Sequence, residues 1–572
     1  MIPVPSNKRD LIDFSKKLID ECRISVAMRS SYYRQLNMIA ETGRYDGSKA
    51  LINMLNFQLT RAADYLFSPV ELQFALDFGR PKRKLDYERA RVVAKELTRT
   101  WDRNNTDMTF GRGVKEALKY GAAILKQWVQ VEGKDEHPVY YDKLVLPWQF
   151  GVYREDENRL DRQEAICETV MLTMPEVWRR ICHLDEARKL YDRIKAHAQT
   201  GTAAPGVDSN QHWVLSANPL NTSGVESTIQ PGGIVQVTSQ ANYGIMGPII
   251  APEVVVMHEL WVKDETDYVT IQMIEPDILI APLHKKANLL GIDGQQPYRL
   301  IQPNEVTDWF WGRSELVDLI EPQALLSTWC EDLRRLMGLQ IEKILGFTGD
   351  AGITDEIYAQ MRLSGWTNLP QGADIKDITP KLPAELIPML KFMLEVINTL
   401  GGFPEIMQGK GEPGVRAGVH ADTLLKTGSP SLRDRSLLVE RQLSQCADLT
   451  LQMMEAKDDE YYWTKADEAI KDVEETKFLL TELPEDWRVT VDSHSSSPIF
   501  ISENQQLLFA LRKLGTVGDD YLIHALPIPH KELAEVQLRD KEKKQAEMLQ
   551  TLLQQDPEVG QKILQKQVGL RR

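Results

Sequence analysis

The sequence predicts an α+β fold that is mainly helical, and three observations support this prediction. Apolar residues recur at helical spacing from residue 8 to about residue 128. Shorter segments of alternating polarity, typical of strands, follow between residues 139 and 274. Long amphipathic segments return beyond residue 312. At 572 residues the chain is too long for one hydrophobic core, so we expect several subdomains.

Composition narrows the class of protein. Hydrophobic content of 42% and charged content of 26% are ordinary for a folded, soluble protein. The net charge of -15 argues against a protein that coats DNA, and is compatible with one that touches DNA along a restricted surface. No signal peptide and no apolar run of ~18 residues is seen, so we expect a cytosolic product without a membrane span. The cysteines have no C-x-x-C spacing and indicate reduced, mostly buried thiols with no zinc site: Cys22, Cys167, Cys182, Cys330 and Cys446.

Four helical segments are expected in the first part of the chain. Ser48 is a plausible N-cap for the second of them and Pro69 its stop. Gly121 marks the point at which the fourth changes from helix to strand. The segments are Lys8 to Arg29, Ser48 to Phe67, Tyr87 to Trp101 and Gly111 to Trp128.

Short strands are expected next, at residues 139–153 and 164–172. The clearest hairpin joins Val254–Val262 to Tyr268–Ile274 through a KDETD turn. The turn contains three acidic residues, Asp264, Glu265 and Asp267, which are candidate metal ligands. At such a turn, however, solvated side chains are the stronger interpretation. The Gly/Ser/Asn-rich segment from Thr200 to Pro248 is a long loop or a hairpin, either exposed without chemistry or functional.

A long helix is expected from Gly312 to Leu345, with Pro322 in the first turn of its main part. From Pro322 onward, 24 residues would span about 36 Å, close to one turn of DNA. This length suits a helix that lines a channel for DNA, and an ordinary core helix is the alternative. The apolar stripe of the predicted helix comprises Leu326, Trp329, Leu333, Leu336, Met337, Ile341 and Ile344.

Cations and indoles lie on or near this helix. Arg334, Arg335 and Lys343 lie off the stripe and either face a DNA channel or pair with Glu331 and Glu342 along the helix, which is the simpler explanation. Three tryptophans lie nearby, Trp309, Trp311 and Trp329. Their indoles either stack on nucleic-acid bases or, as is more common near an apolar stripe, belong to the core.

From Gly346 to Pro383 the chain has short elements rich in Gly and Pro. A module this small cannot bury much apolar surface alone, so it should lean on a neighbour, which in a ring is the next subunit. A helix resumes over 384–400, with Pro388 kinking it or marking its first turn. A Gly-rich loop, a helix over 432–454 and a largely helical tail complete the chain.

One motif matches a nucleotide-binding pattern, but its context does not. Gly409–Gly414 satisfies G-x-G-x-x-G, yet a helical segment precedes it and Pro413 removes a backbone donor. We interpret it as part of a flexible loop whose cations, Lys410, Arg416 and His420, touch DNA phosphates. A plain surface loop is the alternative. Phosphate-loop, G-x-S-x-G and H-E-x-x-H motifs are absent, so we expect no catalytic residues, no metal and no cofactor.

With its segments in this order, the chain resembles the portal proteins of tailed double-stranded DNA bacteriophages. WFWGRSELVDLIEPQALLSTWCEDLRRL (309–336) resembles the start of the first stem helix. VINTLGGFPEIMQGKG (396–411) resembles the end of the second stem helix and the start of the tunnel loop. SLLVERQLSQCADLTLQMM (436–454) occupies the place of the long helix behind that loop. The Ser/Gly/Asn-rich insertion has no counterpart in this layout.

The resemblance implies a division of the chain into family subdomains. These are a mixed α/β wing (1–311, with the insertion at about 200–250), stem helix 1 (312–345), a small α/β clip (346–383), stem helix 2 (384–402), a tunnel loop region (403–431), the rest of the wing (432–502) and a helical crown (503–572).

The resemblance also implies function. Portal subunits form a ring, usually of twelve, at one capsid vertex, through which DNA passes during packaging and ejection. Implied partners are other copies of the chain, double-stranded DNA, the terminase large subunit, major capsid and scaffolding proteins, and adaptor or tail proteins, with no membrane and no enzymatic activity. The implied location of the protein is the portal vertex of the virion and, during assembly, the host cytoplasm. Candidate docking residues in the clip are Asp355, Glu356, Tyr358, Arg362 and Trp366.

Two other functions compete with the portal. One is a head–tail or scaffold-like structural protein without a DNA channel. The other is an enzyme that acts on nucleic acid with metal-bound carboxylates.

Overall fold

In a computed structural model the chain has an α+β fold, as the sequence predicts. The structure describes residues 3–44, 50–67, 72, 74–78, 84–132, 137–200, 227–229, 234–237, 249–250, 253–280, 290–341, 345–348, 374–402, 430–457, 462–463, 477–491, 508–514 and 522, except positions 183, 185, 265, 266, 276, 382 and 484–486. The chain forms two compact units. Unit 1 comprises Met1–Leu36, Leu59–Glu315 and Gly411–Arg572, and unit 2 comprises Asn37–Gln58 and Leu316–Lys410.

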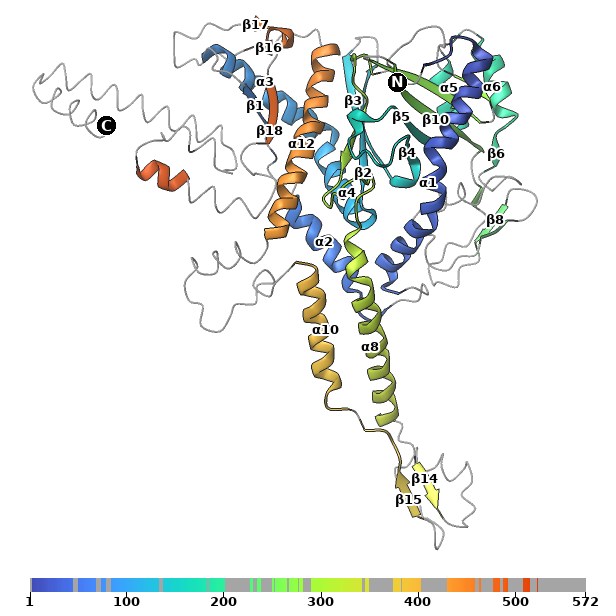
Figure 1. Ribbon diagram of the computed structural model, residues 1–572, viewed down its shortest axis with the longest axis vertical. Helices are drawn as coiled ribbons and strands as arrows, with labels where there is room; N and C mark the ends of the chain where they lie inside the picture. The colour runs from blue at the N-terminus through green and yellow to red at the C-terminus, as the bar shows by residue number, and fades with distance from the viewer. Residues whose placement is uncertain are drawn as a thin grey trace, which may run out of the picture. The chain divides into compact units, whose positions relative to one another are not determined.

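The centre of unit 1 is a six-stranded antiparallel sheet (Figure 1). Its strand order is β12-β11-β10-β5-β4, with β6 also paired to β10. The predicted hairpin is confirmed, because β10 pairs with β11 from Met257↔Ile274 to Asp264↔Asp267. The strands are β4 (Phe150–Val152), β5 (Ala165–Thr173), β6 (Gln199–Thr200), β10 (Glu253–Asp264), β11 (Asp267–Ile274) and β12 (Ile278–Leu279).

Alternation along β10 separates two faces of this sheet. Leu260 and Val262 contact the helix α1 (Lys8–Thr42) through an apolar cluster that includes Leu18 and Cys22. On the other face, Trp261 joins a core shared with a second, three-stranded sheet. Farther along that face, Met257 packs with two short helices, α5 (Met174–Ile181) and α6 (Ala187–Lys195).

The second sheet has the strand order β13-β2-β3. The predicted change from helix to strand at Gly121 is confirmed, since α4 ends at Tyr120 and β2 begins at Ala123. Against this sheet lies α12, where Thr450 Oγ1 accepts hydrogen bonds from Trp101 Nε1 (3.1 Å) and Gln127 Nε2 (2.9 Å). The elements are α3 (Lys84–Asn104), α4 (Thr106–Tyr120), α12 (Pro430–Lys457), β2 (Ala123–Glu132), β3 (His137–Val145) and β13 (Tyr298–Ile301).

Smaller elements complete the described part of unit 1. β1 pairs with β18, and β16 with β17. Within the Gly/Ser/Asn-rich segment, β8 pairs with β7 and β9, and the rest of that segment lies outside the described residues. Residues 508–513 are helical, and most of the expected C-terminal helices lie outside the described residues. The strands are β1 (Phe74–Phe78), β7 (Ser227–Ile229), β8 (Ile234–Val237), β9 (Ile249–Ile250), β16 (Tyr462–Trp463), β17 (Lys477–Phe478) and β18 (Trp487–Val491).

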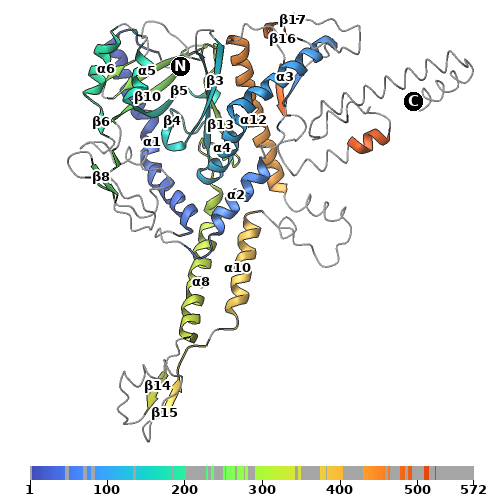
Figure 2. The ribbon, with the colours of Figure 1, turned by 180° about the vertical axis from the view of Figure 1, so that it is seen from behind.

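Unit 2 is built on two helices, α8 (Ile320–Ile341) and α10 (Leu386–Leu400), which lie side by side (Figures 1 and 2). Pro322 and Pro388 fall in their first turns, where a missing N–H costs little. Between the two helices in the chain, β14 (Leu345–Thr348) pairs with β15 (Asp374–Asp377).

Residues 37–58 also belong to unit 2, although the sequence placed them in the N-terminal subdomain. Gln323 on α8 donates to Ile52 O (2.8 Å) and accepts from Met54 N (3.0 Å). Gln58 donates to Asn398 Oδ1 on α10 (2.7 Å). These side-chain bonds join a segment near the start of the chain to both helices of the unit.

Several helix boundaries differ from the sequence prediction. The helix predicted from Gly312 to Leu345 is α8, which runs only from Ile320 to Ile341, after a 3-10 turn at Glu315–Asp318 and before β14, which begins at Leu345. The third predicted helix is longer, at Lys84–Asn104, and the fourth begins at Thr106 instead of Gly111.

The first helix continues to Thr42 instead of ending near Arg29. The second, α2 (Met54–Leu66), begins at Met54 because Asn53 Oδ1 accepts hydrogen bonds from the N–H groups of Leu55 and Asn56. The predicted N-cap, Ser48, lies outside the described residues.

Two glycine backbones meet where unit 1 leads toward α8. Gly121 has φ of 99° and Gly312 has φ of 62°, both in the region that favours glycine. A Cβ on Gly312 would lie 2.7 Å from Gly121 O, and one on Gly121 would lie 2.5 Å from Trp311 O. Ser314 Oγ then donates to Lys119 O (2.6 Å). The Gly-x-Ser sequence at 312–314 is therefore a packed junction.

We expect Gly312→Ala to destabilise unit 1 markedly. A non-glycine residue in a strained backbone region costs about 1–3 kcal/mol, and displacement of the Gly121 backbone adds to this. The urea midpoint followed by tryptophan fluorescence measures the effect. Gly338→Ala is the matched control, because a Cβ on this exposed helical glycine meets nothing within 4 Å. Equal midpoints for the two variants would contradict the prediction.

Candidate functional site

The two helices of unit 2 expose large apolar side chains. Ile341 is 82% exposed, Phe392 61% and Met337 53%. The predicted stripe on the long helix is buried only at its start, since Leu326 is fully buried whereas Met337 and Ile341 are not. We define the α8–α10 surface by its exposed apolar residues, which are Leu325, Met337, Ile341, Ile387, Met389, Phe392 and Leu400.

The helix α10 is apolar on nearly every side. Its sequence, LIPMLKFMLEVINTL, carries charge only at Lys391 and Glu395. Yet only Met393 and Ile397 of this helix are buried in the single chain. A helix that is hydrophobic all round is normally buried in a core. Within the described residues, five of its apolar side chains are nevertheless exposed, and contiguous exposed apolar surface of this kind is typical of an interaction site.

The arginines predicted to face a DNA channel are exposed on α8. Arg334 and Arg335 take part in no ion pair within the described part of the chain. Glu331, the predicted partner along the helix, instead forms an ion pair with Arg44. Lys343, Glu342 and Ile344 lie outside the described residues.

The other predicted site residues also lie outside the described residues. These are the loop cations Lys410, Arg416 and His420, and the clip candidates Asp355, Glu356, Tyr358, Arg362 and Trp366. Their assignment to DNA contact and to docking therefore stays a prediction.

The predicted alternatives for the indoles and the turn acids can be compared with the structure. Trp311 is buried, and the Arg29 guanidinium lies 3.9 Å from the centre of its ring, so it is a core residue. Asp267, predicted to be solvated, is half-buried instead, and its Oδ1 accepts hydrogen bonds from Tyr268 N (2.7 Å) and Gly294 N (2.8 Å). Within the described residues, no group of three His, Cys, Asp or Glu side chains is placed to hold a metal ion.

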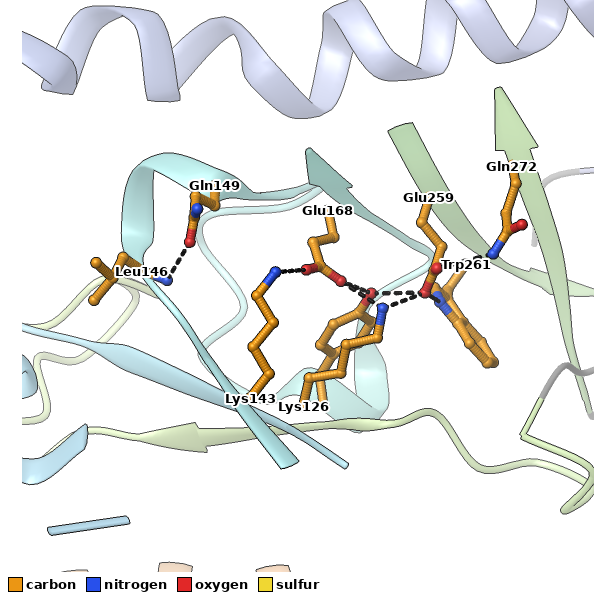
Figure 3. Close-up of polar contacts among 9 residues, drawn as sticks. Lys126, Lys143, Leu146, Gln149, Glu168, Glu259, Trp261 and Gln272 are labelled. Carbon is orange, nitrogen blue, oxygen red and sulfur yellow. Dashed lines mark hydrogen bonds and ion pairs between the residues drawn. The ribbon is translucent and has the colours of Figure 1, made fainter. Parts of the chain in front are cut away.

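A buried charged network joins the two sheets of unit 1 (Figure 3). Lys126 Nζ lies 2.6 Å from Glu168 Oε2 and 2.7 Å from Glu259 Oε1. Lys143 Nζ approaches the other Glu168 oxygen at 3.3 Å. Glu168 and Glu259 are almost completely buried, at 1% and 4% exposure.

Neutral donors complete this network. Trp261 Nε1 donates to Glu259 Oε1 (2.9 Å) and Gln272 Nε2 to Glu259 Oε2 (3.0 Å). The Tyr298 hydroxyl lies 2.8 Å from Glu168 and 3.2 Å from Glu259. Burial alone would raise the pKa of Glu259. The attraction of Lys126 and the donated hydrogen bonds outweigh this effect, so the pKa lies below its usual range. Two cations face two anions with every carboxylate oxygen satisfied, which is the composition of a structural core and not of a reactive site.

A second buried group resembles a catalytic triad in its residue types. Thr169 Oγ1 lies 3.0 Å from His258 Nδ1, and His258 Nε2 lies 2.8 Å from Glu275 Oε1. Thr169 is 4% exposed and His258 1%, and α1 covers this face of the sheet. A nucleophile that no substrate can reach does not catalyse, so we interpret the group as structural.

His258 should make stability depend on pH. Burial lowers its pKa from 6.5, and the Glu275 hydrogen bond opposes this only in part; Arg23 lowers the pKa further and Asp20 raises it. Because the unfolded state then binds the proton more readily, the stabilisation is present above pH 6.5 and is lost as the pH falls through the folded pKa. Urea midpoints between pH 8 and pH 5 should fall more steeply for the wild type than for His258→Gln. Parallel pH profiles would exclude this role.

Comparison of the sequence with protein-family models gave no match, and comparison with curated proteins gave none. No helix within the described residues combines the length and apolarity that a membrane crossing requires.

The Lys126 network and the group formed by Thr169, His258 and Glu275 were not found by reasoning from the sequence. The only local signal is a carboxylate within a mostly apolar stretch of a strand, as with Glu168 in AICETVMLT and with Glu259, next to His258, in the middle of EVVVMHELWVKD. Such residues in buried strands need partners, but the sequence alone does not say which.

Proposed function

We propose that the chain is a portal subunit: it forms a ring with other copies of itself, and double-stranded DNA passes through the ring. The observation that carries the proposal is the α8–α10 surface, where the described part of the chain leaves an almost wholly apolar helix largely exposed. Burial of apolar surface contributes about 25 cal/mol per Å², so side chains of this size favour association strongly.

A ring of identical copies is a physically economical way to cover this surface. Exposed apolar residues occur on both helices, so one subunit can present α8 where the next presents α10. Such a heterologous contact generates a closed ring when its rotation closes. Proline in both first turns and a strand pair between the helices are consistent with a two-helix stem and a small terminal module.

The finer assignments belong to the same proposal. Unit 1 would be the wing, α8 and α10 the stem, and residues 346–383, with β14 and β15, the clip that docks the terminase and later the adaptor or tail proteins. Arg334 and Arg335, exposed on α8, are candidates for the channel wall. The expected location is the portal vertex of the virion, with assembly in the host cytoplasm.

Negative-stain imaging of the purified full chain tests the proposal. We expect rings with a central hole wide enough for a duplex, and their symmetry gives the subunit number. A stable monomer at micromolar concentration would overturn the proposal. Assemblies without a hole would favour the alternative, a head–tail structural protein without a DNA channel. Nuclease or ATPase activity that disappears in metal-free buffer would favour an enzyme.

A further inference from the structure

A basic surface covers the outer side of α5 and α6 in unit 1. Both helices turn their apolar residues inward, since Val177, Ile181 and Ile194 are fully buried in one cluster with β10 and β11. Their exposed sides carry six cations and, on α6, one exposed carboxylate, Asp192, although the whole chain has a net charge of -15. We define the α5–α6 basic surface by Arg179, Arg180, Arg188, Lys189, Arg193 and Lys195, all exposed.

Most of these cations are available for a ligand. Lys189 is paired with Glu186 (2.9 Å), and Arg193 lies 3.8 Å from Asp277. Within the described residues, the side chains of the other four form no ion pair or hydrogen bond. The one carboxylate on α5, Glu176, accepts hydrogen bonds from Thr173 N and Thr173 Oγ1, both at 2.8 Å. The Thr173 hydrogen bonds and, to a smaller extent, the charges of Arg179 and Arg180 lower the pKa of Glu176, so this carboxylate offsets part of their charge without forming an ion pair with either.

We propose that the α5–α6 basic surface binds the phosphate backbone of double-stranded nucleic acid without reading its sequence. Arginine predominates among these cations, and its planar fork suits phosphate oxygens. Protein–nucleic acid interfaces are more polar and more positively charged than interfaces between proteins. This surface fits that description, because Trp178, at 37% exposure, is its only exposed large apolar side chain among the described residues of the two helices.

Other anionic partners fit less well. A helix that lies on a lipid surface inserts a broad apolar face, but Met174, Val177 and Ile181 of α5 are already buried in the protein, which leaves Trp178 as its only exposed large apolar side chain. An acidic protein would need an apolar centre to its interface, and Trp178 alone, held edge-on against Tyr191 at 5.3 Å, does not supply one. The inference does not depend on the ring, because the surface belongs to unit 1 of a single chain.

Binding of a fluorescein-labelled duplex of random sequence to the full chain, followed by anisotropy, tests the inference. The test variant is Arg180→Gln with Arg188→Gln. The matched control is Arg154→Gln with Arg159→Gln, which removes the same charge from exposed arginines already paired with Asp156 and Asp161. We expect the test variant to weaken binding and to make the slope of log K against log salt less negative, by about 0.9 for each phosphate that is no longer neutralised. The control should match the wild type.

A footprint locates the bound duplex. Cys182, at the end of α5, is exposed, whereas the other four cysteines are buried. Duplex should slow alkylation of Cys182 by a neutral maleimide in the wild type and in the control, but not in the test variant. Unchanged alkylation, or equal weakening in test and control variants, would place duplex binding elsewhere and overturn the inference. Protection by polyglutamate or by anionic vesicles but not by duplex would assign the surface to an acidic protein or to a lipid surface instead.

Discussion

If the chain assembles through the α8–α10 surface as proposed, replacing Ile341 and Phe392 together by glutamate should yield monomers that remain folded. Both side chains are mostly exposed in the single chain, so the change costs little within the subunit. In a ring that buries the α8–α10 surface, every interface would have to take up unpaired carboxylates, each at a cost of several kcal/mol. Sedimentation velocity measures the loss of assembly, and far-ultraviolet circular dichroism checks that the helices persist.

The control for this experiment adds the same charge elsewhere on the same helices. Thr328 and Thr399 are exposed polar residues of α8 and α10, and their replacement by glutamate should leave assembly largely intact. If both double variants dissociate, net charge and not apolar contact controls assembly. If rings persist in the variant that carries Ile341→Glu and Phe392→Glu, another surface holds the subunits together.

Lys126→Met should be the most destabilising single change among the charged residues of unit 1. Lys126 lies between two buried carboxylates, and the Tyr298 hydroxyl can donate its one proton to only one of them at a time. Removing one partner of a buried ion pair costs about 3–5 kcal/mol, because the remaining charge is left uncompensated. The urea midpoint of unit 1, followed by near-ultraviolet circular dichroism, measures the loss.

Two further variants make this result interpretable. Lys143→Met removes a cation that is 38% exposed and contacts only Glu168, so we expect a cost below about 1 kcal/mol. Adding Glu259→Gln to Lys126→Met removes one uncompensated charge and should recover part of the lost stability. An equal loss for both lysines would show that the network does not act as a buried unit.

Local features of the fold could be predicted from the sequence. The change from helix to strand at Gly121, the β10–β11 hairpin and the prolines in the first turns of α8 and α10 each depend on neighbouring residues. The apolar character of α10 is equally local. The exposure of α10 could not be predicted in this way. An apolar helix sequence predicts burial, but it does not say whether the same chain or another copy buries the helix.

The remaining features depend on contacts between distant residues. Lys126 meets Glu168 and Glu259 across 42 and 133 positions, so no spacing rule relates them. Gln323 meets Met54 across 269 positions, which explains why the sequence does not group residues 37–58 with α8. Serine is a residue type that commonly caps helices, so the sequence favours Ser48 as the N-cap of the second helix. Asparagine also caps helices, and Asn53 is the residue directly before α2, where its Oδ1 accepts a hydrogen bond from Leu55 N.

The ion pair between Glu315 and Arg435 has a practical consequence for protein engineering. Its 2.8 Å separation holds the outgoing chain, just before α8, next to the returning chain at the start of α12. Chain ends held this close tolerate replacement of everything between them by a short linker. A shortened protein that lacks residues 316–429 would then be a soluble reference for unit 1, with residues 37–58 trimmed or redesigned because their partners are gone.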